Sequence, residues 1–488
     1  MTGLAVRGND LRGPLAALLA RRRRAGHWST PARIRARAAA VLALTCCLAA
    51  LAGVLFGQVR GEFQAMGQRD APEADAMTGL YFALNDMDAQ VANVLLVGGG
   101  TALAANRTQD MKTYASDRTV ADRDLEQAAV SEAGNESAER ELALVLDRMG
   151  QYEALAADAL LAGGQVHSAV GRAPAAAIAY YQQATGLMQL GILPAVGSLT
   201  TVSTANLEAA YQGGETAAGT GTAWLAALGG LLAVVLIAFQ FHLAVRFRRL
   251  VNPALAAATV LAVAFTAVAA VRLGAESGQL RAAKQDAFDS IQALSLARAV
   301  SYDANADESR YLVDPGRAAQ YQQAFLTKSQ QIVNVGPVGI SGYDAALAAD
   351  IKAYERDNAP VRFGGYLGAE FRNITFPGER QAAVAALLSF QRYEKDDRTM
   401  RALAAKSLAA AVGYDIGTAP GQSDWAFNQY DAALSGVIAV NSRAFTAAVH
   451  DGEGGGTGWE LVFPGLGLLL VAALTVAGVR PRLAEYRP

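Results

Sequence analysis

The chain has 488 residues, of which 52% are hydrophobic and 18% charged, against roughly 25% charged in an average soluble domain. With a net charge of −2, this composition excludes an intrinsically disordered protein, which combines low hydrophobicity with a high net charge. Two cysteines exclude a disulfide scaffold, and the four histidines lie far apart in the sequence, so we expect no metal and no cofactor.

Four stretches of about 20 residues contain no charged residue and predict transmembrane helices, since such a length covers the hydrocarbon core of a membrane. The alternative for the first stretch is a signal peptide, because Ala50-Leu51-Ala52 resembles a cleavage site. The apolar residues continue past this site to Val59, which favours a membrane span. The four predicted spans are residues 38–59, 223–245, 250–271 and 461–479.

Arginines are concentrated in three short segments, residues 1–37, 246–249 and 480–488. These segments hold 15 of the 42 basic residues but only 2 of the 44 acidic ones, which leaves 27 basic and 42 acidic residues for the long segments 60–222 and 272–460. The positive-inside rule predicts cytoplasmic termini, a cytoplasmic linker and two extracytoplasmic domains in a multi-pass protein of the plasma membrane. The basic N-terminus is expected to contact anionic membrane lipid, and the acidic outer segments argue against nucleic-acid binding.

The first outer segment has the periodicity of a helical bundle. Apolar residues alternate at spacings of three and four, and this pattern predicts one helix that continues from the first span until Gly98. Further helices are predicted near residues 108–129, near 139–161 before Gly163-Gly164, and after Pro174 with a break at 191–194. Together they predict a four-helix bundle. The residues of the seam are Met77, Leu80, Leu84, Met87, Val91 and Val94.

The second outer segment repeats this plan. Asp86 is followed 13 residues later by Gly99, and Asp303 is followed 13 residues later by Gly316. We therefore predict an all-α membrane protein with four transmembrane helices and two extracytoplasmic helical bundles, built as a span–bundle–span unit used twice. The helices expected in the second bundle cover residues 272–313, 318–333, 341–356, 378–411 and 423–449, before a flexible joint at 452–458.

The seam of the second bundle is polar. Extending the heptad from Ile291 and Leu294 places Arg298, Ser301, Asn305, Glu308 and Leu312 inward. Because buried charge is costly unless it is paired, one interpretation is a pocket that offers Arg298, Asn305 and Glu308 to a small carboxylate. The alternative is a rotated helix with Leu296, Val300 and Tyr302 inward. In the first bundle, Asp86 and Asp88 are candidate partner contacts, or simply solvated carboxylates.

The motifs of common enzymes are absent, since the chain contains no GxxxxGK[ST], HExxH, CxxC or GxSxG. We expect no enzyme activity and propose no catalytic residue. The predicted cytoplasmic segments are too short for a kinase or cyclase module. A signal received outside must therefore reach a separate partner.

Several short motifs resemble a known family. They are Ser29–Arg35, Tyr81–Ala89, Asn373–Arg380 and Phe427–Phe445. With the four spans and two outer bundles, they resemble the four-span actinobacterial membrane proteins called GlnX. That resemblance implies a glutamine-binding-type extracytoplasmic lipoprotein (GlnH-like) and a cytosolic Ser/Thr kinase (PknG-like) as partners, in a system that senses external aspartate or glutamate.

The favoured hypothesis is a transmembrane sensor that relays amino-acid availability to such a kinase. Within the most specific motif, Asn373, Thr375 and Arg380 are the residues expected to dock a partner, and a homodimer is a further expected assembly. A second hypothesis is a mechanical membrane subunit of an ABC-type ATPase complex, which needs an inner surface that grips the ATPase. A third is a structural envelope protein without a ligand.

Overall fold

The computed structural model describes residues 30–99, 103–165, 168–247, 252–357, 360–452 and 459–484. The predictions for most of the basic N-terminus, for the linker and for the joint after Gly452 lie largely outside these residues. The described chain is helical apart from turns and one isolated bridge between Asn334 and Gly364. The predicted all-α class is therefore confirmed.

The chain forms two compact units. The first, here called the apolar unit, comprises residues 1–57, 217–275 and 456–488, and the second, here called the large unit, comprises residues 58–216 and 276–455. Three long helices have residues in both units. They are α2 (Thr30–Ala65), α7 (Leu193–Phe247) and α8 (Pro253–Arg281).

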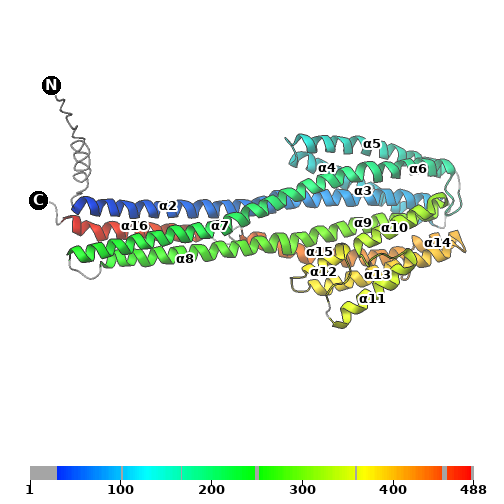
Figure 1. Cartoon of the computed structure of the whole chain (residues 1–488). Helices are drawn as coiled ribbons and strands as arrows, with labels where there is room; N and C mark the ends of the chain where they lie inside the picture. Colours follow the sequence, from blue (N-terminus) through cyan, green and yellow to red (C-terminus); the bar gives the residue numbers. More distant parts are fainter. Residues whose placement is uncertain are drawn as a thin grey trace, which may run out of the picture. The chain divides into compact units, whose positions relative to one another are not determined.

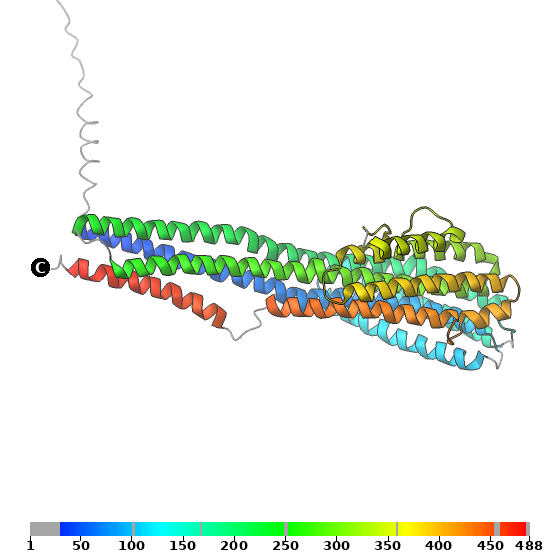
Figure 2. The same ribbon diagram turned by 90° about the horizontal axis from the view of Figure 1, so that it is seen from below.

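Within the apolar unit, parts of α2, α7 and α8 and the helix α16 (Trp459–Ala484) lie side by side (Figures 1 and 2). Close packing requires Gly229 on α7, because a Cβ there would overlap the side chain of Thr266. The amide of Asn252 donates to the carbonyl oxygen of Gly478 at 2.9 Å. Small residues and a few polar contacts thus hold these apolar helices together.

Within the residues that the structure describes, five helical stretches are long and apolar enough to cross a membrane, which indicates a membrane protein. Four of them overlap the predicted spans. The fifth is α15 (Ser423–Gly452), for which the sequence predicts a place in the outer bundle. The stretches are Pro31–Val97, Ala175–Val245, Pro253–Val313, Ser423–Gly452 and Gly465–Ala484.

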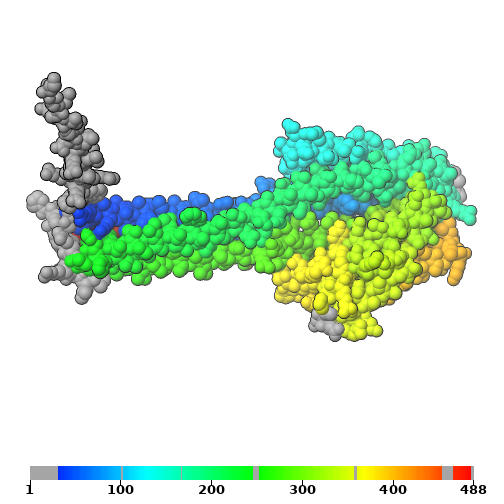
Figure 3. All heavy atoms as spheres, viewed as in Figure 1, coloured from blue at the N-terminus to red at the C-terminus, as the bar shows by residue number. Residues whose placement is uncertain are grey.

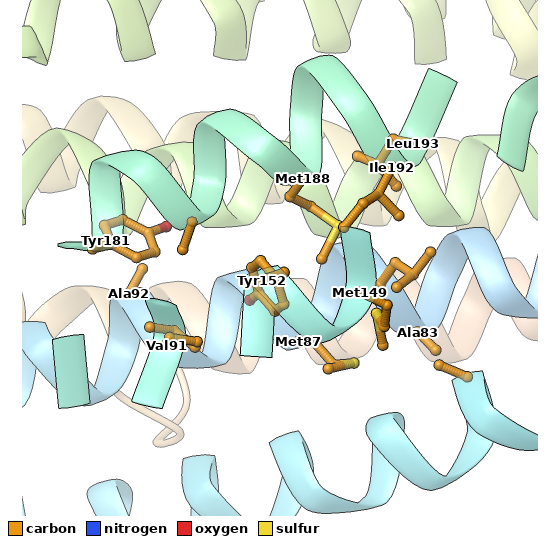
Figure 4. Close-up of a cluster of buried hydrophobic side chains, with 14 of the residues drawn as sticks. Ala83, Met87, Val91, Ala92, Met149, Tyr152, Tyr181, Met188, Ile192 and Leu193 are labelled. Carbon is orange, nitrogen blue, oxygen red and sulfur yellow. The ribbon is translucent and has the colours of Figure 1, made fainter. Parts of the chain in front are cut away.

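The first half of the large unit is built around α3 (Ala71–Val97). The six seam residues predicted on this helix are each at most 3% exposed, so the seam is confirmed. The helix ends at Val97 because Gly98 adopts a positive φ of 68°, as the sequence predicts. Figure 4 shows how Met87 and Val91 of α3 meet Tyr152 and Met188 from other helices.

Around α3 lie α4 (Ala104–Ser131), α5 (Glu136–Gln165) and α6 (Ala175–Leu187). The predicted end of α5 near residue 161 is wrong, because Gly163 serves close packing rather than termination: a Cβ there would lie 2.9 Å from Leu95. The predicted break at 191–194 is also wrong. A π-helical segment, η3 (Met188–Ile192), leads into α7, and Pro194 is tolerated in the first turn of that helix.

The second half begins with the π-helical segment η4 (Ala282–Phe288) and α9 (Asp289–Val313). The predicted helix at 378–411 is two helices, because the chain turns at residues 405–407 and Ser407 accepts a hydrogen bond from the backbone of Ala410. The remaining helices are α10 (Ala318–Ile332), α11 (Ile340–Asp357), α12 (Gly365–Asn373, not predicted), α13 (Glu379–Ala404), α14 (Leu408–Asp415) and α15.

The two halves belong to one unit rather than to separate bodies. Helix α3 packs along α9, and the two halves meet over a continuous surface (Figure 3). Leu312, Met400 and Val412 of the second half join the hydrophobic core of the first. The expected bundles therefore share a core.

The internal repeat extends beyond the two aspartates. Asp303 follows Asp86 by 217 residues, and the π-helical segment η1 (Met66–Asp70) shifted by the same number falls at 283–287, inside η4. The segment η1 directly precedes α3, and η4 directly precedes α9. Because π-helical turns are rare and often lie at functional sites, their recurrence at one offset supports a duplicated plan.

Candidate functional site

A cluster of buried charges lies where the two halves of the large unit meet. At its centre, Arg310 of α9 is 1% exposed, and its guanidinium binds Asp88 at 2.6 Å, Asp303 at 2.9 Å and Asp307 at 2.6 Å. Lys328 of α10 binds the two latter carboxylates at 2.6 and 2.5 Å. We call these five residues the Arg310 cluster. Three carboxylates thus face two cations away from water.

The Arg310 cluster joins the halves. Asp88 lies on α3, and its carboxylate also accepts a hydrogen bond from Thr185 of α6 at 2.6 Å. Arg310 donates to the hydroxyl of Tyr181, again on α6, at 3.0 Å. A guanidinium from the second half therefore binds two acceptors of the first half, Asp88 and Tyr181, besides two carboxylates of its own helix. Removing one partner would leave uncompensated charge in a place with little water, so the contact strongly favours one relative position of α9, α3 and α6.

Arg310 is not among the site residues predicted from the sequence, although the sequence contains a signal for it. Asp303, Asp307 and Arg310 are spaced by four and three residues, so they lie on one face of a helix. The apolar heptad directed attention instead to the face that carries Arg298. A polar face with an arginine next to two acids is usually read as solvated, and only the structure places it against α3 and α6.

Arg298 is already bound within the chain. Its guanidinium contacts Asp431 of α15 at 2.5 and 3.0 Å and lies 4.4 Å from the ring centroid of Phe82. Its side chain is 33% exposed. A free carboxylate would have to displace Asp431, so the predicted pocket is filled by the protein's own acid.

The other two pocket residues lie further along α9. Glu308 is fully buried and accepts hydrogen bonds from the hydroxyl of Tyr393 at 2.8 Å and from the amide of Asn305 at 3.2 Å. Nearby, burial raises the pKa of Asp415 to about 7, and the Asp397 charge acts in the same direction. The structure therefore brings Asn305 and Glu308 together, but not with Arg298.

The alternative of a rotated α9 is not needed. Leu294, Val300, Ser301 and Leu312 are all at most 7% exposed, so residues from both proposed faces are buried. Helix α9 is surrounded on several sides by α3, α10, α12 and α15. A central helix has no solvated face, and for that reason both interpretations of its pattern are partly correct.

Asp86 and Asp88 are neither solvated nor exposed contacts, because both side chains are at most 5% exposed. They face different neighbours. Asp88 belongs to the Arg310 cluster, whereas Asp86 accepts a hydrogen bond from Gln90 at 2.7 Å and adjoins Asp117 of α4. Burial, with the adjacent Asp86 charge, raises the pKa of Asp117 to about 8. Asp86 and Asp117 thus lie together, and among the described residues no cation forms an ion pair with either carboxyl.

The motif around Asn373 forms the loop between α12 and α13. The side-chain amide of Asn373 donates to the backbone oxygen of Gln285 in η4 at 2.8 Å. Arg380 stacks on Tyr354 and binds its hydroxyl group. Thr375 and Arg380 are exposed, so they stay candidates for docking, whereas Asn373 holds the π-helical segment.

An open depression of about 490 Å³ lies on the large unit, away from these residues. Gln323, Thr327 and Gln330 of α10 and the loop around Asn334 line it. Elsewhere, no group of three or more His, Cys, Asp or Glu residues within the described part of the chain is arranged to hold a metal ion.

A helical membrane protein with buried charges between the two halves of its large unit is thus the class that fold and site define. A family model described as an actinobacterial sensor domain matches residues 62–212, which is the first half of the large unit with the ends of its flanking helices. This match supports a sensor protein of actinobacterial type. Neither a curated protein nor a solved structure matches the chain.

Proposed function

We propose that the protein is a transmembrane signal transducer whose large unit receives an extracytoplasmic signal. One observation carries this proposal: the segment that matches the sensor domain, residues 62–212, is joined at both ends to apolar helical stretches. Its first residues lie in α2 and its last in α7, without a linker between sensor and apolar stretch. A displacement inside the sensor segment therefore has a direct helical route towards the membrane.

The proposed topology has four spans, residues 38–59, 223–245, 250–271 and 461–479, with both termini in the cytoplasm. The concentration of arginines in the short segments supports this orientation. Helix α15 is assigned to the outer region despite its apolar composition. It carries Asp431 bound to Arg298, and its Phe427 and Tyr430 belong to the aromatic core of the second half. A lipid-facing helix would not bury these groups against soluble neighbours.

The proposed input is external aspartate or glutamate, delivered by a solute-binding lipoprotein. Docking is favoured over direct binding because Asp431 already occupies the arginine that a free amino acid would need. Thr375 and Arg380 are the exposed docking candidates of the motif at 373–380. The outer segments also carry an excess of acidic residues, which would complement a basic face on the partner.

The proposed output is a cytosolic Ser/Thr kinase, which is the partner that the family resemblance of the motifs at 81–89 and 373–380 implies. A shift of one packed helix against another would alter the surface that this kinase meets. The basic N-terminal segment would lie against anionic lipid headgroups.

The test is the thermal stability of the purified full-length protein in lipid nanodiscs, with aspartate, glutamate or glutamine, and then with the binding protein loaded with each. A site occupied at 100 times its dissociation constant adds about 2.7 kcal/mol to stability. Stabilisation by the loaded binding protein alone is the expected result. Thr375→Ala with Arg380→Ala should reduce it, whereas Glu355→Gln on α11 is the matched surface control.

Stabilisation by the free amino acid, lost in Arg298→Ala, would mean direct binding at Arg298 and would contradict the docking route. No stabilisation by any of these additions would contradict the amino-acid input. Co-purification with an ATPase in place of a kinase would favour the mechanical alternative.

A further inference from the structure

A pair of buried glutamates lies between the helices of the second half. Glu370 of α12 and Glu379 of α13 are both fully buried. The side chains of Glu379, Ser290 and Asn441 adjoin the Glu370 carboxyl, and the latter two are at most 2% exposed. We call Glu370 and Glu379 the carboxyl pair. It brings together α9, α12, α13 and α15.

The position of Glu379 is fixed by the loop that precedes it. Its Oε2 atom accepts hydrogen bonds from the backbone nitrogens of Thr375 at 2.7 Å and Phe376 at 2.8 Å. These two bonds require Oε2 to act as an acceptor. Its Oε1 atom and both carboxyl oxygens of Glu370 are buried without a hydrogen bond of good geometry from the described residues.

The cations on the surrounding elements are bound elsewhere. Lys284 of η4 binds Asp289 of α9 and Glu208 of α7. The charge of the carboxyl pair is therefore not balanced by these side chains. Other cations on these helices also bind elsewhere: Arg372 of α12 donates to the carbonyl of Phe363, Arg380 of α13 to the hydroxyl of Tyr354, and Arg443 of α15 to the carbonyl of Ala439. Arg298 and Arg310 of α9 and Arg398 and Arg401 of α13 bind acids other than the carboxyl pair.

Two adjacent buried carboxyls cannot both carry a negative charge without a large electrostatic cost. We propose that the carboxyl pair binds one proton, held between Glu370 and Glu379, and that this proton makes the large unit responsive to pH near neutrality. No part of this rests on the amino-acid input; with the proposed topology, the pH in question is that outside the cell.

The electrostatics of the site support a proton that is released near neutral pH. Burial raises the pKa of Glu370 to about 7, and the adjacent Glu379 adds to the effect, while Ser290 and Asn441 act in the opposite direction. Asp286 on η4 and Asp289 at the start of α9 are acids, so they do not stabilise a doubly ionised pair. A change from neutral to mildly alkaline pH therefore changes the charge of the pair.

Loss of this proton would change the forces on segments that continue towards the apolar stretches. Ser290 lies in the first turn of α9, directly after η4, and Asn441 lies on α15, which precedes α16 along the chain. The same loop holds η4 through Asn373, whose amide donates to the carbonyl oxygens of Gln285 and Asp286. Repulsion between the two carboxylates would push α12 and α13 apart. This movement would weaken the hydrogen bonds between Asn373 and η4.

The sign of the stability effect follows from the raised pKa. The folded protein binds this proton more tightly than the unfolded chain, so stability is greatest at low pH and falls as the pH rises from about 4.5 to about 7. Within that window the unfolding equilibrium constant should change up to about 10-fold per pH unit from this group.

The experiment measures thermal unfolding of the full-length protein in nanodiscs from pH 5 to pH 8.5. Glu370→Gln keeps the shape of the neutral carboxyl and should reduce the pH dependence in this range by the contribution of this one proton, making the variant more stable than the wild type at pH 8. The matched control is Glu355→Gln, because Glu355 is exposed on α11. That control should keep the wild-type profile.

A second readout separates protonation from a purely structural role. Infrared difference spectra between pH 5 and pH 8.5 should show a protonated carboxyl signal in the wild type that is reduced in Glu370→Gln. Ser290→Ala removes the hydroxyl that adjoins Glu370 and favours its ionised form, so the titration midpoint should move to higher pH. This variant also provides the test if Glu370→Gln does not fold.

The proposal is overturned if Glu370→Gln retains the wild-type pH profile and infrared signal, or if Ser290→Ala leaves the midpoint unchanged. It is also overturned if calcium, magnesium or sodium restores wild-type stability at pH 8, because the pair would then bind a cation in place of the proton. None of these outcomes depends on the amino acids or on a binding protein, so they leave the proposed input untouched.

Discussion

Helix α9 carries two arginines, twelve residues apart, that both bind carboxylates on other helices but differ in their surroundings. Arg298 has a side chain that is one-third exposed, and it binds a single acid, Asp431. Arg310 is 1% exposed and binds three. Both contacts cross between helices, yet only the second is shielded from water on all sides. Both contacts join an arginine to aspartates, so the difference between them lies in burial and in the number of acids bound. We therefore expect Arg310, more than Arg298, to fix the position of α9.

The largest predicted effect is at Arg310. Arg310→Met should lower the free energy of unfolding by about 3–5 kcal/mol, because three buried carboxylates are then left with Lys328 alone. Asp307→Asn should cost clearly less, since it leaves two carboxylates for two cations. Thermal and denaturant unfolding of the full-length protein measures both. Equal losses in the two variants would mean that charge balance in the Arg310 cluster is unimportant.

The next effect concerns Asp86 and Asp117, two adjacent buried carboxyls in the first half. Burial and the Asp86 charge raise the pKa of Asp117 to about 8, so the folded state holds its proton more tightly and stability falls as the pH rises from about 4 to 8. Asp117→Asn should therefore be more stable than the wild type at pH 8, by about 1–3 kcal/mol, the cost of an uncompensated buried polar group. Asp122→Asn, an exposed change on α4, is the control and should follow the wild type.

A smaller loss is expected at Arg298. Arg298→Ala should cost about 1–2 kcal/mol, from a charge-assisted hydrogen-bond pair and a contact with Phe82 that are partly open to water. Arg298→Lys should recover only part of this loss, because an ammonium group cannot reproduce the two parallel bonds to Asp431. A loss as large as that of Arg310→Met would contradict the comparison between the two arginines.

The smallest effect is expected at an exposed ion pair. Arg140 and Glu136 are 3.5 Å apart on α5, and their side chains are 76% and 88% exposed. Glu136→Gln should change the stability by less than about 0.5 kcal/mol, since water and salt screen such pairs. A measurable loss that persists at high salt would show that exposure is a poor guide to the strength of charge contacts in this protein.

The sequence predicts those features that depend on local patterns. The heptad from Met77 to Val94 is buried as expected, and Gly98 and Asp314 mark the ends of α3 and α9. The prediction was wrong at Gly163, which serves close packing, and at Pro194, which the first turn of α7 tolerates. The role of Gly163 depends on Leu95, a neighbour distant in sequence that no local pattern contains.

The candidate site was predictable only in part. The polar seam indicated that α9 buries charge, and Glu308 and Asn305 do lie together. The partners of that charge come from remote segments: Asp431 for Arg298, and Asp88 with Tyr181 for Arg310. Because a single sequence does not state which remote residues meet, it presented Arg298 as free and left Arg310 unnoticed. Partner identity at the sequence level stays a prediction.

Whether the two halves of the large unit act as one body is tested most directly by hydrogen exchange of the full-length protein in nanodiscs, with wild type, Arg310→Met and Arg298→Ala compared. Arg310→Met should speed amide exchange in α6 of the first half as well as in α9 and α10 of the second, whereas Arg298→Ala should change only the neighbourhood of α9 and α15. Faster exchange confined to the second half in Arg310→Met would contradict this prediction, because the halves would then be two independent bundles.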